Sequence, residues 1–322
     1  CYPGQTFTPI DNTNLTSYDA TLTVGETSVH PVIYDLPVET DGDAGLFAAL
    51  NSTAELHHIC LAGAQISGKG NVGAMIGATK GKLTIDHCQV LLSQLKGHVN
   101  GKNETDVWIS GATVGGLVGE ITSGTVTVEN SFAASVLSGT DRAGGLIGNI
   151  AGAAVTVKNS YADCYLYSDA STGRTGGLVG GYQNTSGLNI ENCYAAGFQQ
   201  AGTTAGLVAD ALYTGDSVSN TYTACAPLTG EQLTFSTTVK PTDAVSPKFS
   251  KVFYLCTAET DMAGTAFVNA SQWTGANNRA EAAELLGDAF TAETGGTNTV
   301  PYNLMQNKGL GAYSYPKLKD IP

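Results

Sequence analysis

Two arginines stand at equivalent places in the sequence and are candidates for binding an anion. Arg142 and Arg174 each lie four residues before the leucine of a glycine-rich phrase, Leu146 and Leu178. If these phrases mark a repeated structural unit, the two guanidinium groups lie one above the other, with Asp141 beside the first. Guanidinium groups bind carboxylates through paired hydrogen bonds. The pair is therefore a candidate contact for an anionic glycan, and the alternative is that both are solvated turn residues.

Acidic residues also recur at a fixed place, at Asp86, Glu129 and Glu191. Polysaccharide lyases and hydrolases use converging carboxylates, the lyases usually with calcium and a basic residue. Lys158 falls within the same series, and a repeat spacing of ~4.8 Å would be set by strand stacking rather than by a reaction. We therefore expect no catalytic residue, no metal site and no bound cofactor.

Histidines recur in the neighbouring series, at His58 and His87. Imidazoles at equivalent places in adjacent units would stack. Stacked imidazoles can serve as metal ligands, or they can simply pack as neutral rings. We expect the metal-free stack.

Aromatic residues form a third series, Phe132, Tyr161, Tyr194 and Tyr222. Facing solvent, the three tyrosines would form a flat strip able to stack on sugar rings. Facing inward, they would be core. The two-residue alternation of a strand does not decide between these, because a turn at the preceding asparagine interrupts it, and we favour core.

A five-residue glycine phrase aligns all of these series. Its copies are Gly73–Gly77, Gly115–Gly119, Gly144–Gly148, Gly176–Gly180 and the weaker Ala205–Ala209. The central apolar residues, with Leu46 added, are Leu46, Met75, Leu117, Leu146, Leu178 and Leu207, at steps of 29, 42, 29, 32 and 29 residues. A period near 29 residues indicates a solenoid.

A short strand is expected about ten residues after each phrase. The candidate strands are Leu83–Cys88, Val126–Phe132, Val155–Tyr161 and Leu188–Tyr194. Apolar and polar residues alternate in them, which predicts strands with one buried face. We predict an all-β chain folded as a parallel β-solenoid of about six or seven coils. In this alignment the asparagines of one column form a structural ladder of side-chain hydrogen bonds: Asn130, Asn159, Asn192 and Asn220.

The repeat resembles the GLUG repeat, named for a Gly-Leu-x-Gly core and found in large cell-surface and secreted bacterial proteins, many of them predicted adhesins. The resemblance rests on three copies with a double glycine, each followed by a strand ending in Asn-Ser-aromatic-Ala or Asn-Cys-Tyr-Ala: Gly115–Gly119, Gly144–Gly148 and Gly176–Gly180. It covers about residues 45–225, and the copies at Met75 and Leu207 lack the double glycine. It implies an extracellular, non-catalytic bacterial scaffold and identifies no ligand.

Composition agrees with a turn-rich extracellular β protein. Charged residues are 13% of the chain and glycine is 40 of 322 residues, whereas about 25% of an average globular protein is charged. The apolar fraction of 42% is enough for a core, which excludes a disordered chain. The net charge of -13 argues against nucleic acid and anionic membranes as partners. The chain has no apolar run of the ~18 residues that a transmembrane segment needs.

Three regions are expected along the chain. Residues 1–44 form a β cap over the exposed strand edges of the solenoid, residues 45–225 form the repeats with an insertion loop at 94–109, and residues 226–322 form the last coil and a C-terminal cap. The last region contains a candidate coil strand, Val252–Cys256, one short helix within Asn277–Phe290, and a closing segment, Thr299–Pro316. The insertion loop is a further candidate for ligand recognition.

Seven cysteines leave the disulfide pairing open. Only Cys60 with Cys88 and Cys225 with Cys256 belong to consecutive coils, and we expect buried thiols that act as small apolar residues. Cys1 is a candidate for lipidation or for an intermolecular disulfide, unless the sequence simply begins there by an arbitrary boundary.

These patterns favour a non-enzymatic bacterial surface protein, located outside the cell and serving as an adhesive or structural module for a glycan or protein ligand of a host or cell wall. The first alternative is a filament subunit that assembles head to tail through its solenoid ends. The second is a polysaccharide lyase or a glycan-binding β-helix.

Overall fold

The computed structural model describes residues 7–11, 16–24, 27–91, 109–169, 171–183, 187–210, 212–227, 248–254, 271–272, 279–291 and 317–319. Several features of the sequence lie outside these ranges: Cys1, Cys256, the closing segment 299–316, and the insertion loop apart from Ile109.

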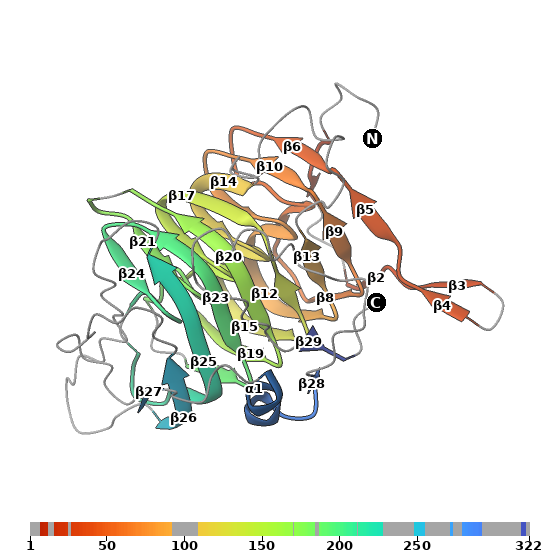
Figure 1. The fold of residues 1–322 in the computed structure, drawn as a ribbon. Coiled ribbons are helices and arrows are strands. Elements are labelled where there is room, and N and C mark those ends of the chain that lie inside the picture. Colours follow the sequence, from red (N-terminus) through yellow and green to blue (C-terminus); the bar gives the residue numbers. More distant parts are fainter. Residues whose placement is uncertain are drawn as a thin grey trace.

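Nearly all regular structure in the described residues is parallel β, wound into a solenoid of about six turns (Figure 1). This confirms the predicted fold class. The predicted strands are neighbours in the predicted register, since Val126 pairs with Val155 and Val155 with Leu188. Equivalent residues of successive repeats therefore form columns along the solenoid.

The first coil is formed by part of the segment expected to cap the solenoid. Its strands are β1 (Ile10–Asp11), β2 (Tyr18–Asp19), β5 (Val32–Tyr34) and β6 (Pro37–Glu39). They pair in parallel with the second coil, β7 (Phe47–Leu50), β8 (Ala54–His57), β9 (Cys60–Ala62) and β10 (Gln65–Ser67). An antiparallel hairpin, β3 (Leu22–Val24) and β4 (Thr27–Val29), is inserted between β2 and β5 and projects from this end of the stack (Figure 1).

The strands of the middle coils are two to twelve residues long. They are β11 (Asn71–Gly73), β12 (Ile76–Asp86), β13 (Gln89–Leu91), β14 (Ile109–Gly115), β15 (Val118–Glu129), β16 (Phe132–Ala133), β17 (Val136–Gly144), β18 (Ile147–Ile150), β19 (Ala153–Lys158) and β20 (Tyr161–Tyr167). The later strands are β21 (Arg174–Gly176), β22 (Leu188–Glu191), β23 (Tyr194–Gln200), β24 (Thr203–Ala205), β25 (Ser217–Pro227), β26 (Lys248–Tyr254) and β27 (Ser271–Gln272). The strand expected at Val252–Cys256 corresponds to β26, which adds to β25 in parallel.

The glycine phrase is a corner where consecutive coils approach very closely. A Cβ atom on Gly116 or Gly145 would overlap the carbonyl oxygen of the equivalent glycine in the next coil. The central leucine of the phrase points into the core, and its backbone continues the ladder, since Leu117 N–H donates to the Leu146 carbonyl at 2.9 Å. Each fully buried leucine contributes about 1.5–3 kcal/mol.

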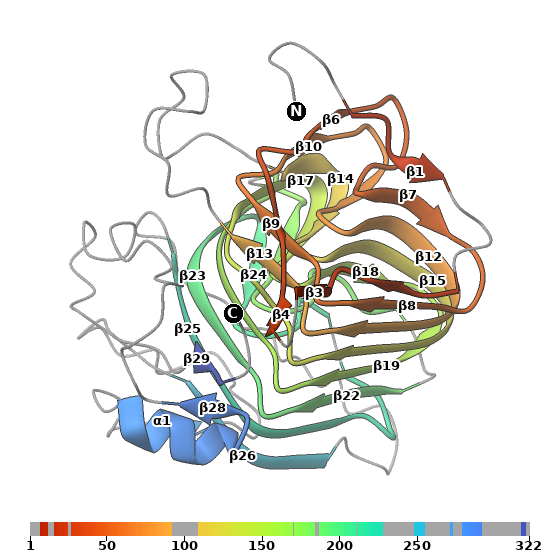
Figure 2. The same ribbon diagram turned by 90° about the vertical axis from the view of Figure 1, so that its right-hand side faces the viewer.

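A second hydrophobic cluster lies outside the coil. The C-terminal elements α1 (Arg279–Leu286), β28 (Phe290–Thr291) and β29 (Lys317–Leu318) lie outside the coil beside β23 and β25 (Figure 2). The helix falls within the predicted range. The molecule thus has one core inside the coil and a smaller one on its flank.

Candidate functional site

The asparagine ladder, Asn130, Asn159, Asn192 and Asn220, occupies a turn that demands a left-handed backbone. All four residues have φ between 47° and 53°. Asparagine tolerates this conformation better than most residues. The turn also turns each side chain along the solenoid axis toward the previous coil.

Hydrogen bonds join the asparagine ladder in one direction. The Nδ2 group of Asn220 donates to Asn192 at 3.0 Å, that of Asn192 to Asn159 at 3.0 Å, and that of Asn159 to Asn130 at 3.2 Å. Asn130 in turn donates to the Asp86 carboxylate at 2.9 Å. The aligned amide dipoles therefore end on an anion, which stabilises their common direction.

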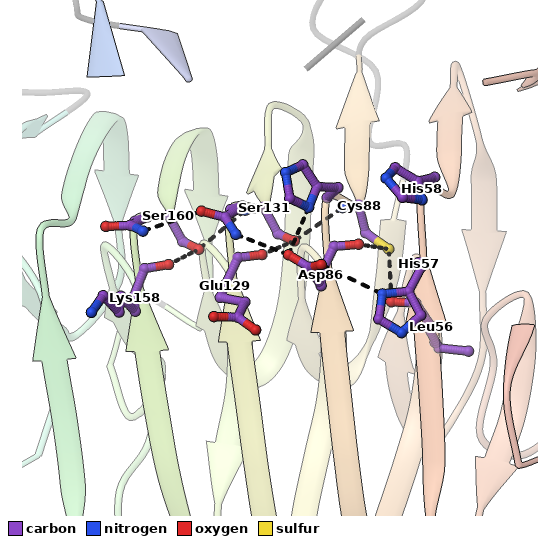
Figure 3. Close-up of polar contacts among 12 residues, drawn as sticks. Leu56, His57, His58, Asp86, Cys88, Glu129, Ser131, Lys158 and Ser160 are labelled. Atoms are coloured by element: carbon purple, nitrogen blue, oxygen red, sulfur yellow. Dashed lines mark hydrogen bonds and ion pairs between the residues drawn. The ribbon is translucent and has the colours of Figure 1, made fainter. Parts of the chain in front are cut away.

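Buried hydroxyls and thiols follow the ladder one residue later (Figure 3). Ser131 donates to the carbonyl of Glu129 at 2.6 Å, and Ser160 donates to that of Lys158 at 2.7 Å. Cys193 takes the same role toward the carbonyl of Glu191 at 3.1 Å. These groups satisfy backbone carbonyls at the turn, so their contacts are structural.

The two candidate arginines contact a carboxylate of their own chain. Arg142 donates to Asp210 at 3.1 Å and to Asn149 at 3.1 Å, while Arg174 donates to the other oxygen of Asp210. The backbone N–H of Tyr182 completes the shell of Asp210 at 2.9 Å. The Arg142 and Asp210 side chains are only 18% and 13% exposed, so neither alternative offered by the sequence describes Arg142.

Polar contacts continue from these arginines along the corner. Asn149 donates to Glu120 at 2.9 Å, and Asn71 donates to the other oxygen of Glu120 at 2.9 Å. We call Asn71, Glu120, Arg142, Asn149, Arg174 and Asp210 the arginine network. Both guanidinium groups of the network contact the single carboxylate of Asp210, and Glu120 contributes a second negative charge through its bonds with Asn71 and Asn149.

The sequence contains a signal for the arginine network, but it is not visible when only the two arginine positions are aligned between repeats. Each acceptor directly follows a glycine phrase: Glu120 follows Gly119, Asn149 follows Gly148, and Asp210 follows Ala209. Strand pairing places Glu120 beside Asn149. The column after the phrase faces the arginine column before it, across the glycine corner.

The aromatic column, Phe132, Tyr161, Tyr194 and Tyr222, lies on the outer flank and is covered. Consecutive ring centroids are 4.6, 4.7 and 5.1 Å apart, with interplanar angles of 5° to 6°. The three tyrosines are 1–4% exposed and pack with Leu286 and Phe290 of the C-terminal elements. They are core as favoured, but in the flank cluster rather than inside the coil, and they offer no open strip for a sugar.

Asp163 interrupts this apolar flank. It lies on the same face of β20 as Tyr161 and Tyr165, next to Ala196 of β23. Burial raises the pKa of its carboxyl to about 6. The sequence shows the alternation of tyrosine and aspartate, but it does not show that this face is covered.

Three histidines, His30, His58 and His87, form a stack at the N-terminal end, which we call the histidine column. The ring centroids of His30 and His58 are 4.4 Å apart, and those of His58 and His87 are 5.3 Å apart. The sequence showed His58 and His87 but not His30, because the inserted hairpin interrupts the repeat period. Among the described residues, no group of three or more His, Cys, Asp or Glu side chains is arranged to hold a metal ion.

The described thiols are buried and unbonded to one another. They are Cys60, Cys88, Cys164, Cys193 and Cys225. Burial raises the pKa of Cys60 to about 11 and that of Cys88 to about 12, so neither is a ready nucleophile. The Cys60–Cys88 pairing left open by the sequence is not formed.

In the acidic series, Lys158 contacts Glu191 at 3.4 Å, both side chains being more than 40% exposed. Asp86 is instead surrounded by donors, with His87 Nδ1 at 2.7 Å and His57 Nδ1 at 3.5 Å (Figure 3). The series therefore does not act as one site: one member anchors the asparagine ladder, and the others are solvated.

No helix in the described part of the chain is long and apolar enough to cross a membrane. No family model matches the sequence, and no curated protein matches it either.

Proposed function

We propose that the chain is a non-catalytic β-solenoid module of an extracellular bacterial surface protein, with an adhesive or structural role. The observation that carries the proposal is the use of its polar side chains. The asparagine ladder, the arginine network and the buried hydroxyls all bond within the fold, in the columns that the repeat creates. A chain whose polar side chains hydrogen-bond mainly between its own coils is suited to forming a rigid, extended surface.

The likeness of the repeats to GLUG sequences supports the proposed location. Low charge, abundant glycine and a net charge of -13 suit a module exposed to the medium. Its ligands would be glycans or proteins of a host or a cell wall. The broad coil faces, and not the covered tyrosines, would carry such contacts.

Binding and turnover measured side by side test this proposal. The purified chain is applied to an array of host and cell-wall glycans, and the same glycans are incubated with it in solution, with and without calcium. We expect binding without cleavage for an adhesive module, or neither for a structural one. Release of unsaturated or reducing sugar ends would overturn the proposal, and an antibody that labels intact producing cells would support the surface location.

A filament subunit is the second candidate, because the described strands of the first coil have a strand partner only in the second coil. Among the described strands, β1, β2, β5 and β6 each pair on one side only. Their lengths of two or three residues and the projecting hairpin limit flush stacking (Figure 1). Electron microscopy and light scattering across concentration distinguish fibres from discrete rods, and reductant tests whether Cys1 joins the copies.

A further inference from the structure

The histidine column sits where the first coil departs from the repeat. In the second coil, two residues separate His57 from Cys60, whereas residues 20–31 separate their partners Asp19 and Val32. The hairpin therefore replaces a tight turn. His30, at the base of the hairpin, stacks on His58, which occupies the left-handed turn of the next coil.

Each imidazole of the histidine column comes from a different coil. The His30 and His58 rings are 18° from parallel, and the His58 and His87 rings are 29° from parallel. Thr21 Oγ1 lies 3.2 Å from His30 Nδ1 and 3.1 Å from His58 Nδ1. The hydroxyl thus bridges the two rings and joins both strands of the hairpin base to the second coil.

The carboxylates around the histidine column are fewer than its rings. Asp19 lies 3.1 Å from His58 Nδ1, and Asp86 lies 2.7 Å from His87 Nδ1. Asp86 also faces His57, which has Glu55 on its other side at 3.6 Å. Within the described residues, His30 has Thr21 as its hydrogen-bond partner and makes no ion pair of its own.

We propose that the histidine column is an acid-sensitive clasp that holds the first coil and its hairpin on the solenoid at neutral pH and loosens when His30 takes up a proton. Adjacent rings of the column, with centroids 4.4 and 5.3 Å apart, can stack without charge repulsion when they are neutral. A proton on His30 places a positive charge against the His58 ring, 4.4 Å away, where His30 has a hydroxyl and no carboxylate as its described hydrogen-bond partner.

The carboxylates do not titrate over the same range. Hydrogen bonds from Thr21 lower the pKa of Asp19 to about 2. For Asp86, burial acts to raise the pKa, but hydrogen bonds from Asn130 and His87 outweigh it and lower the pKa. Both remain ionised as the pH falls from 7 to 5, so the charge of these two carboxylates stays constant over that range.

The sign of the effect follows from His30. Burial, followed by the charge of His58, lowers the pKa of His30. The unfolded segment therefore takes up a proton at a higher pH than the folded one does. Its contribution to stability is present above the ordinary histidine pKa and is lost as the pH falls below it.

Hydrogen exchange measured by mass spectrometry at pH 7.5 and pH 5.0, corrected for the intrinsic rate, tests the clasp in the full chain. Peptides covering residues 16–34 report the first coil, and peptides covering residues 153–169 report the middle of the solenoid. We expect residues 16–34 to lose protection several-fold at pH 5.0 while the middle coils keep theirs. Equal protection of residues 16–34 at both pH values would overturn the proposal.

Three variants separate the clasp from a general effect of acid. His30→Phe keeps a ring on His58 but cannot titrate, so residues 16–34 should stay protected at both pH values. His30→Gln removes the ring and should leave them weakly protected at both. His57→Gln, outside the stack, should behave as the wild type. A pH response that survives His30→Phe, or one abolished by His57→Gln, would contradict the proposal, and circular dichroism checks that each variant folds.

Discussion

At the scale of single residues, Asp163 is a carboxyl whose ionised form destabilises the folded state. It shares a face of β20 with Tyr161 and Tyr165, and burial raises its pKa from 3.8 to about 6. A raised carboxyl pKa means that the folded state holds the proton more tightly than the unfolded state. The associated stability is present below the unfolded pKa and is lost as the pH rises through about 6.

Asp163→Asn should therefore stabilise the protein at pH 7.5, by on the order of 2 kcal/mol, and by about half as much at pH 5, which lies between the unfolded and the folded pKa of this carboxyl. The amide removes the charge of this partly buried side chain and keeps its shape. Denaturant unfolding at the two pH values measures the difference. Asp141→Asn, at an exposed position, is the control. An equal effect of Asp163→Asn at both pH values would show that its charge is not the cause.

The glycine after the fourth full phrase has a different role from the glycines within the phrases. Gly181 has no side chain in the path of Arg142, and a Cβ atom there would overlap the Arg142 guanidinium. That space lets Arg142 reach Asp210 across an intervening coil. The network therefore depends on a residue that makes no polar side-chain contact itself.

Gly181→Ala should displace the Arg142 guanidinium and cost about 1–3 kcal/mol, the typical cost of leaving a buried polar partner unsatisfied. Chemical denaturation measures this loss. Gly42→Ala is the matched control, since a Cβ atom at Gly42 meets nothing within 4 Å. If Arg142→Ala and Arg142→Ala with Gly181→Ala were equally stable, the cost of the alanine at residue 181 would be confirmed as acting through Arg142; additive losses would contradict it.

At the scale of elements, the left-handed turn and the asparagine ladder are separate contributions to the same corner. Asn159 supplies both, with φ of 47° and hydrogen bonds to Asn130 and from Asn192. Asn159→Gly removes the hydrogen bonds and keeps the turn conformation accessible. Asn159→Ala removes the hydrogen bonds and adds the left-handed strain of about 1–2 kcal/mol.

We expect Asn159→Gly to lose about 1–3 kcal/mol, from two net hydrogen bonds of about 0.5–1.5 kcal/mol each, and Asn159→Ala to lose about 1 kcal/mol more. Thermal and denaturant unfolding of the pair measure the two parts. Equal losses would mean that the backbone strain is relieved elsewhere, and no loss for glycine would mean that water replaces the ladder.

The repeat explains why some elements were predictable from the sequence and others were not. Leu117, Leu146 and Leu178 stand at nearly constant spacing, and a column follows from that spacing by counting. The aromatic column is covered by α1, which lies far from it in the sequence and outside the repeat, so the spacing of the repeats does not predict this contact. The place of His30 depends on an insertion, which breaks the count. Periodicity thus gives contacts between coils and says little about contacts between the coil and the rest.

At the scale of the whole molecule, the two hydrophobic clusters divide the structure into parts with different support. The coil core is continuous through the stacked strands, so each coil is held by its neighbours. The flank cluster depends on a helix of eight residues and on β28 and β29, which are two-residue strands. Such a small element has few contacts of its own and should open before the coils do.

Leu286→Ala should release this flank without unfolding the solenoid. Leu286 is fully buried against the aromatic column, and truncation of a buried leucine costs about 2–5 kcal/mol. Hydrogen exchange should show lost protection for residues 279–291 and unchanged protection for β15 and β19, and a dye that binds exposed apolar surface should bind more strongly as the tyrosines become accessible. Leu285→Ala, at a partly buried neighbour, should have a smaller effect. If Leu286→Ala instead lowered the protection of β15 and β19 together with that of α1, the flank and the coil would form one cooperative unit, and the C-terminal elements would be part of the solenoid's stability rather than a cover added to its side.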